Sequence, residues 1–275
     1  MKLRLLPSAF HRPSAAGDPP PAQPLTSFIV EGAGGAGPLA IDAGSIGLVG
    51  AAEDMARTRE LILTHAHIDH IASLPMWLEA LVSQGRAPIR VHASAAAIET
   101  LRAHVFNGAV YPDFEAIKDA DGRALLELVE FPVEENFDLA GFTVRAFEVD
   151  HPVATHGLLV DDGENAVIFG ADSGPTERLW EVAASAPRVR VIVLETSFPD
   201  HLQSIADGAG HLTPATLATE LAKAPKGVRV LITHLKPAYR EEIITALAEL
   251  GDSRLRVLDP GVQVEIGAEL RLASD

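Results

Sequence analysis

Four side chains that bind divalent metals lie within six residues of the sequence. They are His65, His67, Asp69 and His70, and they follow the short apolar run of residues 61–63. Imidazole nitrogens and carboxylate oxygens are ordinary ligands of first-row metals. This many such groups in one turn would repel one another or need partners if no metal were bound. The run therefore predicts a site that holds two metal ions close together and uses them on a substrate.

The same layout recurs four times later in the sequence. An apolar, strand-like run ends, and a ligand-type side chain follows it; these residues are His151, Asp172, Glu195 and His234. Loops at strand ends are where α/β proteins place their chemistry. We therefore expect these loops to meet the turn at residues 65–70.

The candidate ligands divide into two sets. The first ion is expected to bind His65, His67 and His151. The second is expected to bind Asp69, His70 and His234. Asp172 suits the position between them, because each oxygen of a carboxylate can bind one ion. Histidine nitrogen and carboxylate oxygen suit zinc, manganese or iron, so we expect two divalent ions and take zinc as the first choice.

The surrounding elements must bring these loops together. The sequence has 275 residues, of which 47% are hydrophobic, so it can form a large core. No repeat or break in composition marks a second domain, and we expect one domain over residues 1–275 with a Pro-rich loop at residues 13–24. Strand patterns fall into two halves with helices between them, which predicts two packed sheets covered by helices. The absence of cysteine excludes thiolate ligands and disulfides.

Hydrophobic periodicity places the individual elements. Strands are expected at residues 2–6, 27–31, 39–42, 61–64, 89–92, 126–131, 143–149, 157–160, 166–169, 189–194 and 228–232, and the tail 255–272 returns to a strand pattern. Helices are expected at residues 53–59, 68–83, 93–104, 176–184, 213–222 and 241–250, while residues 107–124 fit neither pattern. Residues 32–37 match G-x-G-x-x-G, but Pro38 and another strand follow, so they are expected to form a hairpin loop.

The charge of the chain bears on its partners. A formal net charge of −16 repels a nucleic-acid backbone, so we expect no nucleic-acid polymer as partner. A small anionic phosphodiester remains compatible, because bound metal ions supply positive charge locally. No run approaches the roughly 20 apolar residues of a membrane span, and the N-terminus lacks a signal-peptide pattern. We expect a cytoplasmic protein without a membrane partner, and a homodimer is left open.

With these residues identified, the chain resembles the metallo-β-lactamase superfamily. Residues 65–70 match its H-x-H-x-D-H signature, and His151, Asp172 and His234 match its later ligand positions in order. The resemblance covers nearly the whole chain. It implies an αββα four-layer sandwich and metal-assisted hydrolysis.

Five further segments resemble the class II 3′,5′-cyclic-nucleotide phosphodiesterases: residues 42–45, 170–176, 194–199, 210–214 and 233–237. This narrower resemblance implies hydrolysis of cyclic AMP or cyclic GMP, with cleavage of the 3′ bond to give the 5′-monophosphate. One departure is visible. The family usually has Gly-Asp-Thr-Gly at the bridging aspartate, whereas Ala171 and Ser173 flank Asp172 here.

The resemblance also suggests individual roles. His211 is the candidate proton donor to the leaving oxygen, since it lies in the turn before the helix at residues 213–222. Asp69 is expected to hydrogen-bond the attacking water as well as to bind metal. His156 is the alternative to His151 as ligand; we prefer His151, which directly follows a strand. Glu195 either orients a metal-bound histidine or is a surface carboxylate. Lys236 either neutralises substrate charge or is solvated.

Two other functions compete with this one. A tRNA 3′-processing endonuclease of the same superfamily shares the ligand order and a histidine like His211, but the charge of −16 disfavours it. A lactamase or a thioester hydrolase does not explain residues 210–214. The third alternative is a non-catalytic, metal-loaded scaffold that binds a nucleotide.

Overall fold

The strands form two sheets in the computed structural model, which describes residues 1–8, 23–49, 57–86, 88–267 and 269–273. The first sheet has eight strands, in the spatial order β15 (Leu270–Ala273), β14 (Gln263–Ile266), β1 (Lys2–Leu5), β2 (Phe28–Glu31), β3 (Leu39–Ile41), β4 (Glu60–Ile62), β5 (Ile89–Ala93) and β6 (Leu126–Glu130). The second has seven, in the order β13 (Leu255–Val257), β12 (Arg229–Thr233), β11 (Val189–Glu195), β10 (Ala166–Phe169), β9 (His156–Asp161), β8 (Phe142–Glu148) and β7 (Asn136–Leu139).

The helices lie in two groups. Those that precede the second sheet in sequence are α1 (Ile46–Val49), α3 (Ile68–Ile71), α4 (Leu74–Ser83) and α5 (Ala95–His104). The later ones are α6 (Arg178–Ser185), α7 (Gln203–Ala209), α8 (Pro214–Leu221) and α9 (Arg240–Glu249). Single 3₁₀ turns occur at η1 (Ala33–Gly35), η2 (Asp200–Leu202) and η3 (Pro237–Tyr239).

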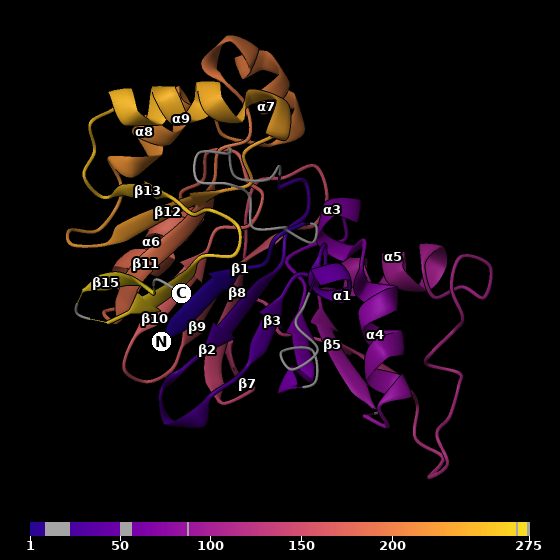
Figure 1. Cartoon of the computed structure of the whole chain (residues 1–275). Coiled ribbons are helices and arrows are strands. Elements are labelled where there is room, and N and C mark those ends of the chain that lie inside the picture. Colours follow the sequence, from indigo (N-terminus) through magenta and orange to yellow (C-terminus); the bar gives the residue numbers. More distant parts are fainter. Residues whose placement is uncertain (9–22, 50–56, 87, 268, 274–275) are drawn as a thin grey trace, which may run out of the picture.

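Three apolar layers hold these elements together. The inner faces of the sheets share a core to which Val30, Phe142 and Val193 contribute. A second core joins the first sheet to α1, α4 and α5, with Trp77 fully buried in it. A third joins the second sheet to α6, α8 and α9, around Trp180. This order of helix, sheet, sheet and helix confirms the expected αββα sandwich (Figure 1).

Several boundaries differ from the sequence-based expectation. The helix expected at residues 68–83 is two helices, because Ser73 at the break donates from both its N–H (3.0 Å) and its Oγ (2.8 Å) to the buried carbonyl of Ala43. The tail is not one strand: β13 lies in the second sheet, and β14 and β15 lie in the first. The hairpin expected at residues 32–37 is confirmed, since β2 and β3 around it pair antiparallel.

Some segments were not anticipated. Strand β7 and helix α7 were not predicted, because they are short and largely exposed and therefore lack a strong apolar period. Helix α1 was not predicted either, because it has only four residues. Residues 107–124 form an irregular loop in which the rings of Tyr111 and Phe114 pack together, with centroids 5.5 Å apart. The expected Pro-rich loop at residues 13–24 and helix at residues 53–59 fall mostly outside the described residues.

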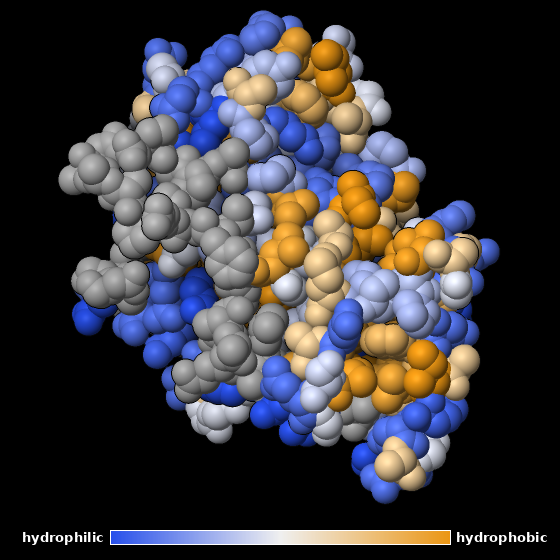
Figure 2. All heavy atoms as spheres, turned by 45° about the vertical axis from the view of Figure 1, so that its right-hand side comes forward, coloured by the Kyte–Doolittle hydropathy of each residue, from blue (hydrophilic) through white to orange (hydrophobic). Residues whose placement is uncertain are grey.

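The parallel strands determine where the loops meet. Strands β3 to β6 are parallel to one another, and so are β10 to β13, so that loops after several strands emerge at the same edge of each sheet. On the side that carries α3, α4 and α5, Figure 2 shows hydrophobic patches interspersed with hydrophilic side chains. Among the helices of the described residues, none is both long and apolar enough to cross a membrane.

Candidate metal centre

The strand ends bring all seven expected ligands together. The turn at residues 65–70 follows β4 and enters α3, while the other three ligands follow β8, β10 and β12 of the second sheet. Possible metal-binding groups within the described residues include a set of His65, His67 and His151 and a set of Asp69, His70, Asp172 and His234. These are the two sets that the sequence analysis proposed, with Asp172 beside the second.

The first set consists of three imidazoles that face one another. His67 Nδ1 lies 3.1 Å from His151 Nε2. The ring centroid of His65 lies 4.7 Å from that of His67 and 5.2 Å from that of His151. Burial lowers the pKa of all three rings, which keeps their nitrogens neutral and able to bind a cation.

In the second set, Asp172 is the shared carboxylate. Its Oδ2 lies 3.4 Å from the Nε2 atoms of both His70 and His234, and 4.0 Å from Nε2 of His65 in the first set. His234 Nε2 also lies 3.0 Å from Asp69 Oδ2. Although burial favours the protonated carboxyl, His234 and His70 hold the pKa of Asp172 well below its usual range. An ionised oxygen between the two sets is what a bridging ligand requires.

Two buried nitrogens support metal binding directly. Nε2 of His65 and Nε2 of His70 are shielded from water and make no hydrogen bond to the described residues. An unpaired polar atom at such depth is costly unless a ligand engages it. Both atoms belong to the ligand cluster, so the donor set fits two divalent ions.

Asp42 supports one histidine of each set, His70 directly and His65 through Thr64. Its Oδ2 accepts from His70 Nδ1 at 2.7 Å and from Thr64 Oγ1 at 2.8 Å. Thr64 Oγ1 in turn lies 3.0 Å from His65 Nδ1, from which it accepts because its own proton goes to Asp42. These contacts keep the proton on Nδ1 and leave Nε2 of both histidines free for metal.

Two of the three remaining ligand histidines, His151 and His234, are held in the same manner by the second half of the chain. His151 Nδ1 lies 3.0 Å from the carbonyl of Gly210 and donates to it. His234 Nδ1 lies 2.9 Å from Ser197 Oγ, which donates to Glu195 Oε2 at 2.7 Å. The choice of His151 over His156 agrees with this geometry: His156 packs against Phe131, with ring centroids 5.4 Å apart, and belongs to neither ligand set.

Glu195 links this support to His211. The carboxylate is only 3% exposed, so it is not a surface group. Its Oε1 lies 3.2 Å from His211 Nδ1 and accepts from the N–H of Leu212 at 2.7 Å. Burial disfavours the charged imidazole, but the hydrogen bond and charge of Glu195 outweigh it and raise the pKa of His211. A buried histidine whose protonated form is favoured thus lies beside the metal ligands, with its ring 5.2 Å from that of His151.

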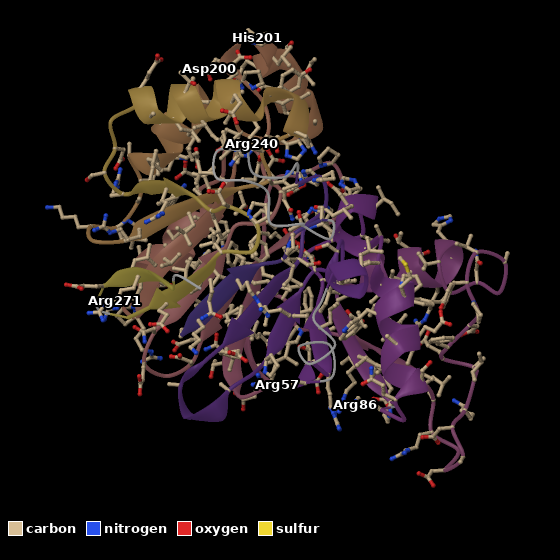
Figure 3. The ribbon with its side chains drawn as sticks, in the orientation of Figure 1. Arg57, Arg86, Asp200, His201, Arg240 and Arg271 are labelled. Carbon is tan, nitrogen blue, oxygen red and sulfur yellow. The ribbon has the colours of Figure 1, made fainter. Side chains whose placement is uncertain are left out.

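Of two other polar residues, Lys236 lies close to the site and His201 lies away from it. Lys236 is half-buried, and its ammonium lies 3.9 Å from Asp69 Oδ2, so it adds a positive charge at the second ligand set. His201 is exposed and pairs with Glu242 at 2.9 Å. Figure 3 shows His201 and Asp200 at the end of the molecule formed by α7 and α9, on its outer side.

The sequence analysis identified the ligands but not all of their supports. It gave no role to Asp42, Thr64 or Ser197, although residues 42–45 and 194–199 had been quoted for their resemblance to the phosphodiesterases. The sequence did offer one signal, since the polar residue Asp42 directly follows the apolar run of β3. Its partner could not be deduced, because His70 is 28 residues further along the chain, in α3.

Comparisons with known proteins agree with this fold and site. A family model described as "Beta-lactamase superfamily domain" matches residues 48–235. The chain belongs to the metallo-β-lactamase superfamily. A crystal structure of unliganded yeast PDE1 has the same fold, with a TM-score of 0.74, 18% identity, and 95% of this chain and 98% of that chain covered.

Two kinds of curated relatives share sequence with it. A probable 3′,5′-cyclic-nucleotide phosphodiesterase of Yersinia pestis is 24% identical in an alignment of 204 residues that covers 65% of this chain and 57% of that protein. A ribonuclease Z of Mycobacterium avium is 31% identical in an alignment of 231 residues that covers 72% of this chain and 78% of that protein. The chain thus matches little more than half the length of the Yersinia protein.

Proposed function

We propose that the chain is a metal-dependent phosphodiesterase that cleaves the 3′ bond of a 3′,5′-cyclic nucleotide to give the 5′-monophosphate. The observation that carries the proposal is the Glu195–His211 pair beside two sets of metal ligands. Such a pair is suited to protonating a poor leaving group such as the alkoxide of the ribose 3′ oxygen. Support comes also from the relatives in Yersinia pestis and Saccharomyces cerevisiae, named as cyclic-nucleotide phosphodiesterases and 24% and 26% identical.

In this proposal His211 donates a proton and Asp69 orients the attacking water. Glu195 holds Nδ1 of His211, and Nε2 of that ring has no hydrogen-bond partner within the described residues, so it is free to give its proton to the ribose 3′ oxygen. Burial raises the pKa of Asp69, but the hydrogen bond from His234 lowers it below its usual range, so this carboxylate is ionised and can orient the attacking water. Two divalent ions, zinc in the first instance, would supply Lewis acidity and a nucleophilic water at neutral pH.

Lys236 gives the site a positive charge that can attract an anionic substrate. A cyclic nucleotide carries one negative charge on its phosphate. The ammonium of Lys236, 3.9 Å from Asp69, lies on the side of the second ligand set and is about one-third exposed. It can therefore attract a small anion to the site even though the chain as a whole is strongly acidic.

Product analysis tests the proposal. Metal-loaded protein is incubated with cyclic AMP and cyclic GMP, and the products are separated by chromatography. We expect the 5′-monophosphate, and His211→Ala is expected to lower kcat by about a hundredfold or more. His201→Ala is the matched control, because this histidine is exposed and paired outside the site. A 3′-monophosphate product, or full turnover by His211→Ala, would refute the assigned chemistry.

Ribonuclease Z activity is the second candidate, because the mycobacterial relatives cover more of the chain than the phosphodiesterases do. A net charge of −16 opposes the binding of a polyanion. The same protein preparation is therefore tested on precursor tRNA at low and high salt. Salt-sensitive cleavage of the precursor without turnover of cyclic nucleotides would favour this alternative. Bound metal without hydrolysis of any phosphodiester would favour a nucleotide-binding scaffold.

A further inference from the structure

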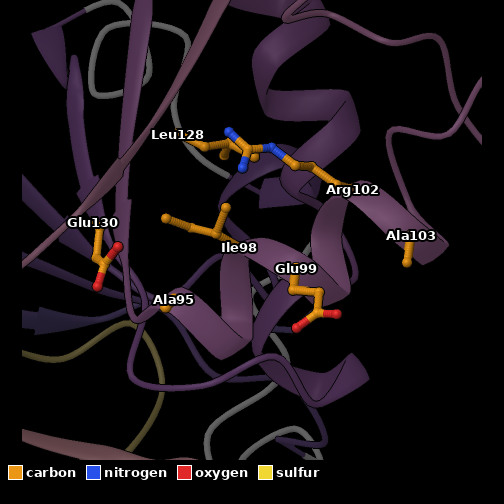
Figure 4. A pocket seen from close by; sticks show the side chains of 7 residues that line it. All are labelled: Ala95, Ile98, Glu99, Arg102, Ala103, Leu128 and Glu130. Carbon is orange, nitrogen blue, oxygen red and sulfur yellow. The ribbon is translucent and has the colours of Figure 1, made fainter.

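The outer edge of the first sheet borders a groove separate from the ligand cluster. Strand β6 is the last strand of that sheet and pairs in parallel with β5. The groove, of about 620 Å³, runs between this strand and α5; Ile98, Glu99 and Arg102 line it from the helix, and Leu128 and Glu130 line it from the strand (Figure 4).

Hydrogen bonds at both ends of β6 establish which backbone groups point outward. The carbonyl of Leu125 accepts from the first residue of β5 at 3.0 Å, and Phe131 N–H donates to the last residue of β5 at 3.2 Å. Leu126 N–H instead donates to Phe114 of the neighbouring loop at 3.1 Å. Because backbone groups alternate along a strand, the odd-numbered residues of β6 face β5 and the even-numbered residues face away.

Leu128 and Glu130 are therefore the open part of this edge. Their N–H and C=O groups point away from β5, and no other strand of the described residues pairs there. The same two residues line the groove. Unpaired strand groups next to a side-chain groove are what an added β-strand recognises, since the backbone supplies hydrogen bonds and the groove receives alternate side chains.

The side chains around the edge specify the chemistry of a partner. Leu128 and the buried Ile98 form an apolar floor. Glu99 and Glu130 line the groove and have no ion pair among the described residues. The exposed Glu127, on the other face of the strand, likewise has no ion pair there. Arg102 does not offset them, because Glu115 engages its guanidinium twice, at 2.7 and 2.8 Å. The open edge is thus apolar in its middle and negative at its ends.

We propose that β6 binds an extended peptide segment of another protein, with the pattern basic–apolar–apolar–basic, as an additional strand. Its apolar residues would lie opposite Leu128 and Val129, and its basic residues opposite Glu127 and Glu130. Opposite charges directly across a strand pair are favourable and like charges are not. A second copy of this chain fits less well, because its own β6 would bring two further glutamates to an edge that is already negative.

A synthetic peptide tests the inference independently of the enzymatic activity. The probe is Ser-Lys-Val-Val-Lys-Ser, capped at both ends and titrated into the isotope-labelled full chain. We expect amide shift changes and slowed hydrogen exchange at Leu128 and Glu130. A peptide with glutamate in place of lysine, and one N-methylated on its valines, are expected to bind at least tenfold more weakly. Equal binding of either control, or no binding of the probe at millimolar concentration, would overturn the proposal.

Charge reversal on the protein gives the complementary test. The double variant Glu127→Lys and Glu130→Lys is expected to lose at least tenfold in affinity for the basic peptide and to gain affinity for the acidic one. Glu249→Lys is the matched control, since this residue is exposed at the end of α9. Sedimentation of the protein alone completes the test: a dimer in which Leu128 and Glu130 are already protected would assign the edge to a second copy and contradict a basic partner.

Discussion

Four of the five histidines in the ligand cluster have one nitrogen engaged by a supporting group and the other directed toward the cluster. Asp42 engages His70, Thr64 engages His65, Gly210 engages His151 and Ser197 engages His234. This arrangement fixes the tautomer and the orientation of the rings before a metal binds. The ligand residues could be predicted from their dense spacing, whereas their supports come from distant parts of the sequence and depend on the folded packing.

Glu195 is expected to affect catalysis more than substrate binding. In Glu195→Gln the negative charge that raises the pKa of His211 is lost, and we expect kcat to fall about tenfold to a hundredfold with little change in KM. Metal content is measured in parallel, because Glu195 also supports Ser197. Glu220→Gln is the matched control: this buried glutamate accepts from Trp180 Nε1 at 2.7 Å and belongs to none of the possible metal-binding groups of the described residues, so the change should lower stability and leave kcat intact. An unchanged kcat in Glu195→Gln would remove this carboxylate from the mechanism.

His156 should make the stability of the protein depend on pH. Burial lowers its pKa from 6.5, although Glu148 and Glu134 act to raise it, and its Nδ1 has no hydrogen-bond partner. At pH values between the lowered pKa and 6.5, the unfolded chain binds more protons at His156 than the folded chain does. The free energy of unfolding therefore has its full value with respect to this group above pH 6.5, and it falls as the pH decreases below 6.5. The loss is at most about 1.4 kcal/mol per pH unit for this group.

Urea unfolding of metal-loaded protein at pH 7.5 and pH 5.5 measures the effect. His156→Gln should lose less free energy of unfolding over this interval than the unmodified chain, because glutamine does not titrate. His201→Gln is the control at an exposed histidine. The role assigned to His156 would be wrong if both variants followed the unmodified chain.

At the scale of the elements, short left-handed turns direct the ligands out of the strands. Asp42, Ala171 and His234 each follow a strand and have φ values of 59°, 56° and 58°. This conformation is strained for residues other than glycine, and such strain is common at functional sites. It also gives a physical reason why the resembling phosphodiesterases usually have glycine at the position of Ala171.

Ala171→Gly is therefore expected to stabilise the protein. The left-handed conformation costs an L-residue roughly 1–2 kcal/mol, of which glycine's greater freedom in the unfolded chain cancels part, so the net gain should be about 0.5–1 kcal/mol. Denaturant unfolding measures it. Ala166→Gly, at the first residue of the same strand and without a positive φ, should instead lower stability. A loss of stability in Ala171→Gly comparable to that in Ala166→Gly would show that the turn is not strained.

Most regular elements could be predicted because their apolar periods are long, as in β11 and α6. The exceptions had weaker local signals. The break between α3 and α4 depends on the contact of Ser73 with Ala43, which is distant in the sequence. The tail strands β13 and β14 both have a strand pattern in the sequence, and only tertiary pairing assigns them to different sheets.

At the scale of the whole molecule, the ligand cluster joins the two sheets. His65, His67, Asp69 and His70 extend from the first sheet, while His151, Asp172 and His234 extend from the second. The sequence could indicate two groups of ligands, but their convergence depends on sheet packing around the shared core. Metal ions held by both groups would cross-link the layers, so metal affinity and fold stability are linked.

Metal removal should consequently lower the stability of the entire domain. A ligand that binds the folded state alone contributes RT ln(1 + [L]/Kd), about 4 kcal/mol at a concentration 1,000 times Kd, which corresponds to a shift in Tm of roughly 10 °C. Thermal unfolding with excess zinc and with a chelator measures the difference. Asp172→Asn is expected to lose most of this increment, because the shared oxygen then lacks its charge, and His201→Gln should retain it. Equal Tm values with zinc and with chelator would mean that the cluster does not join the sheets through metal, whatever the protein hydrolyses.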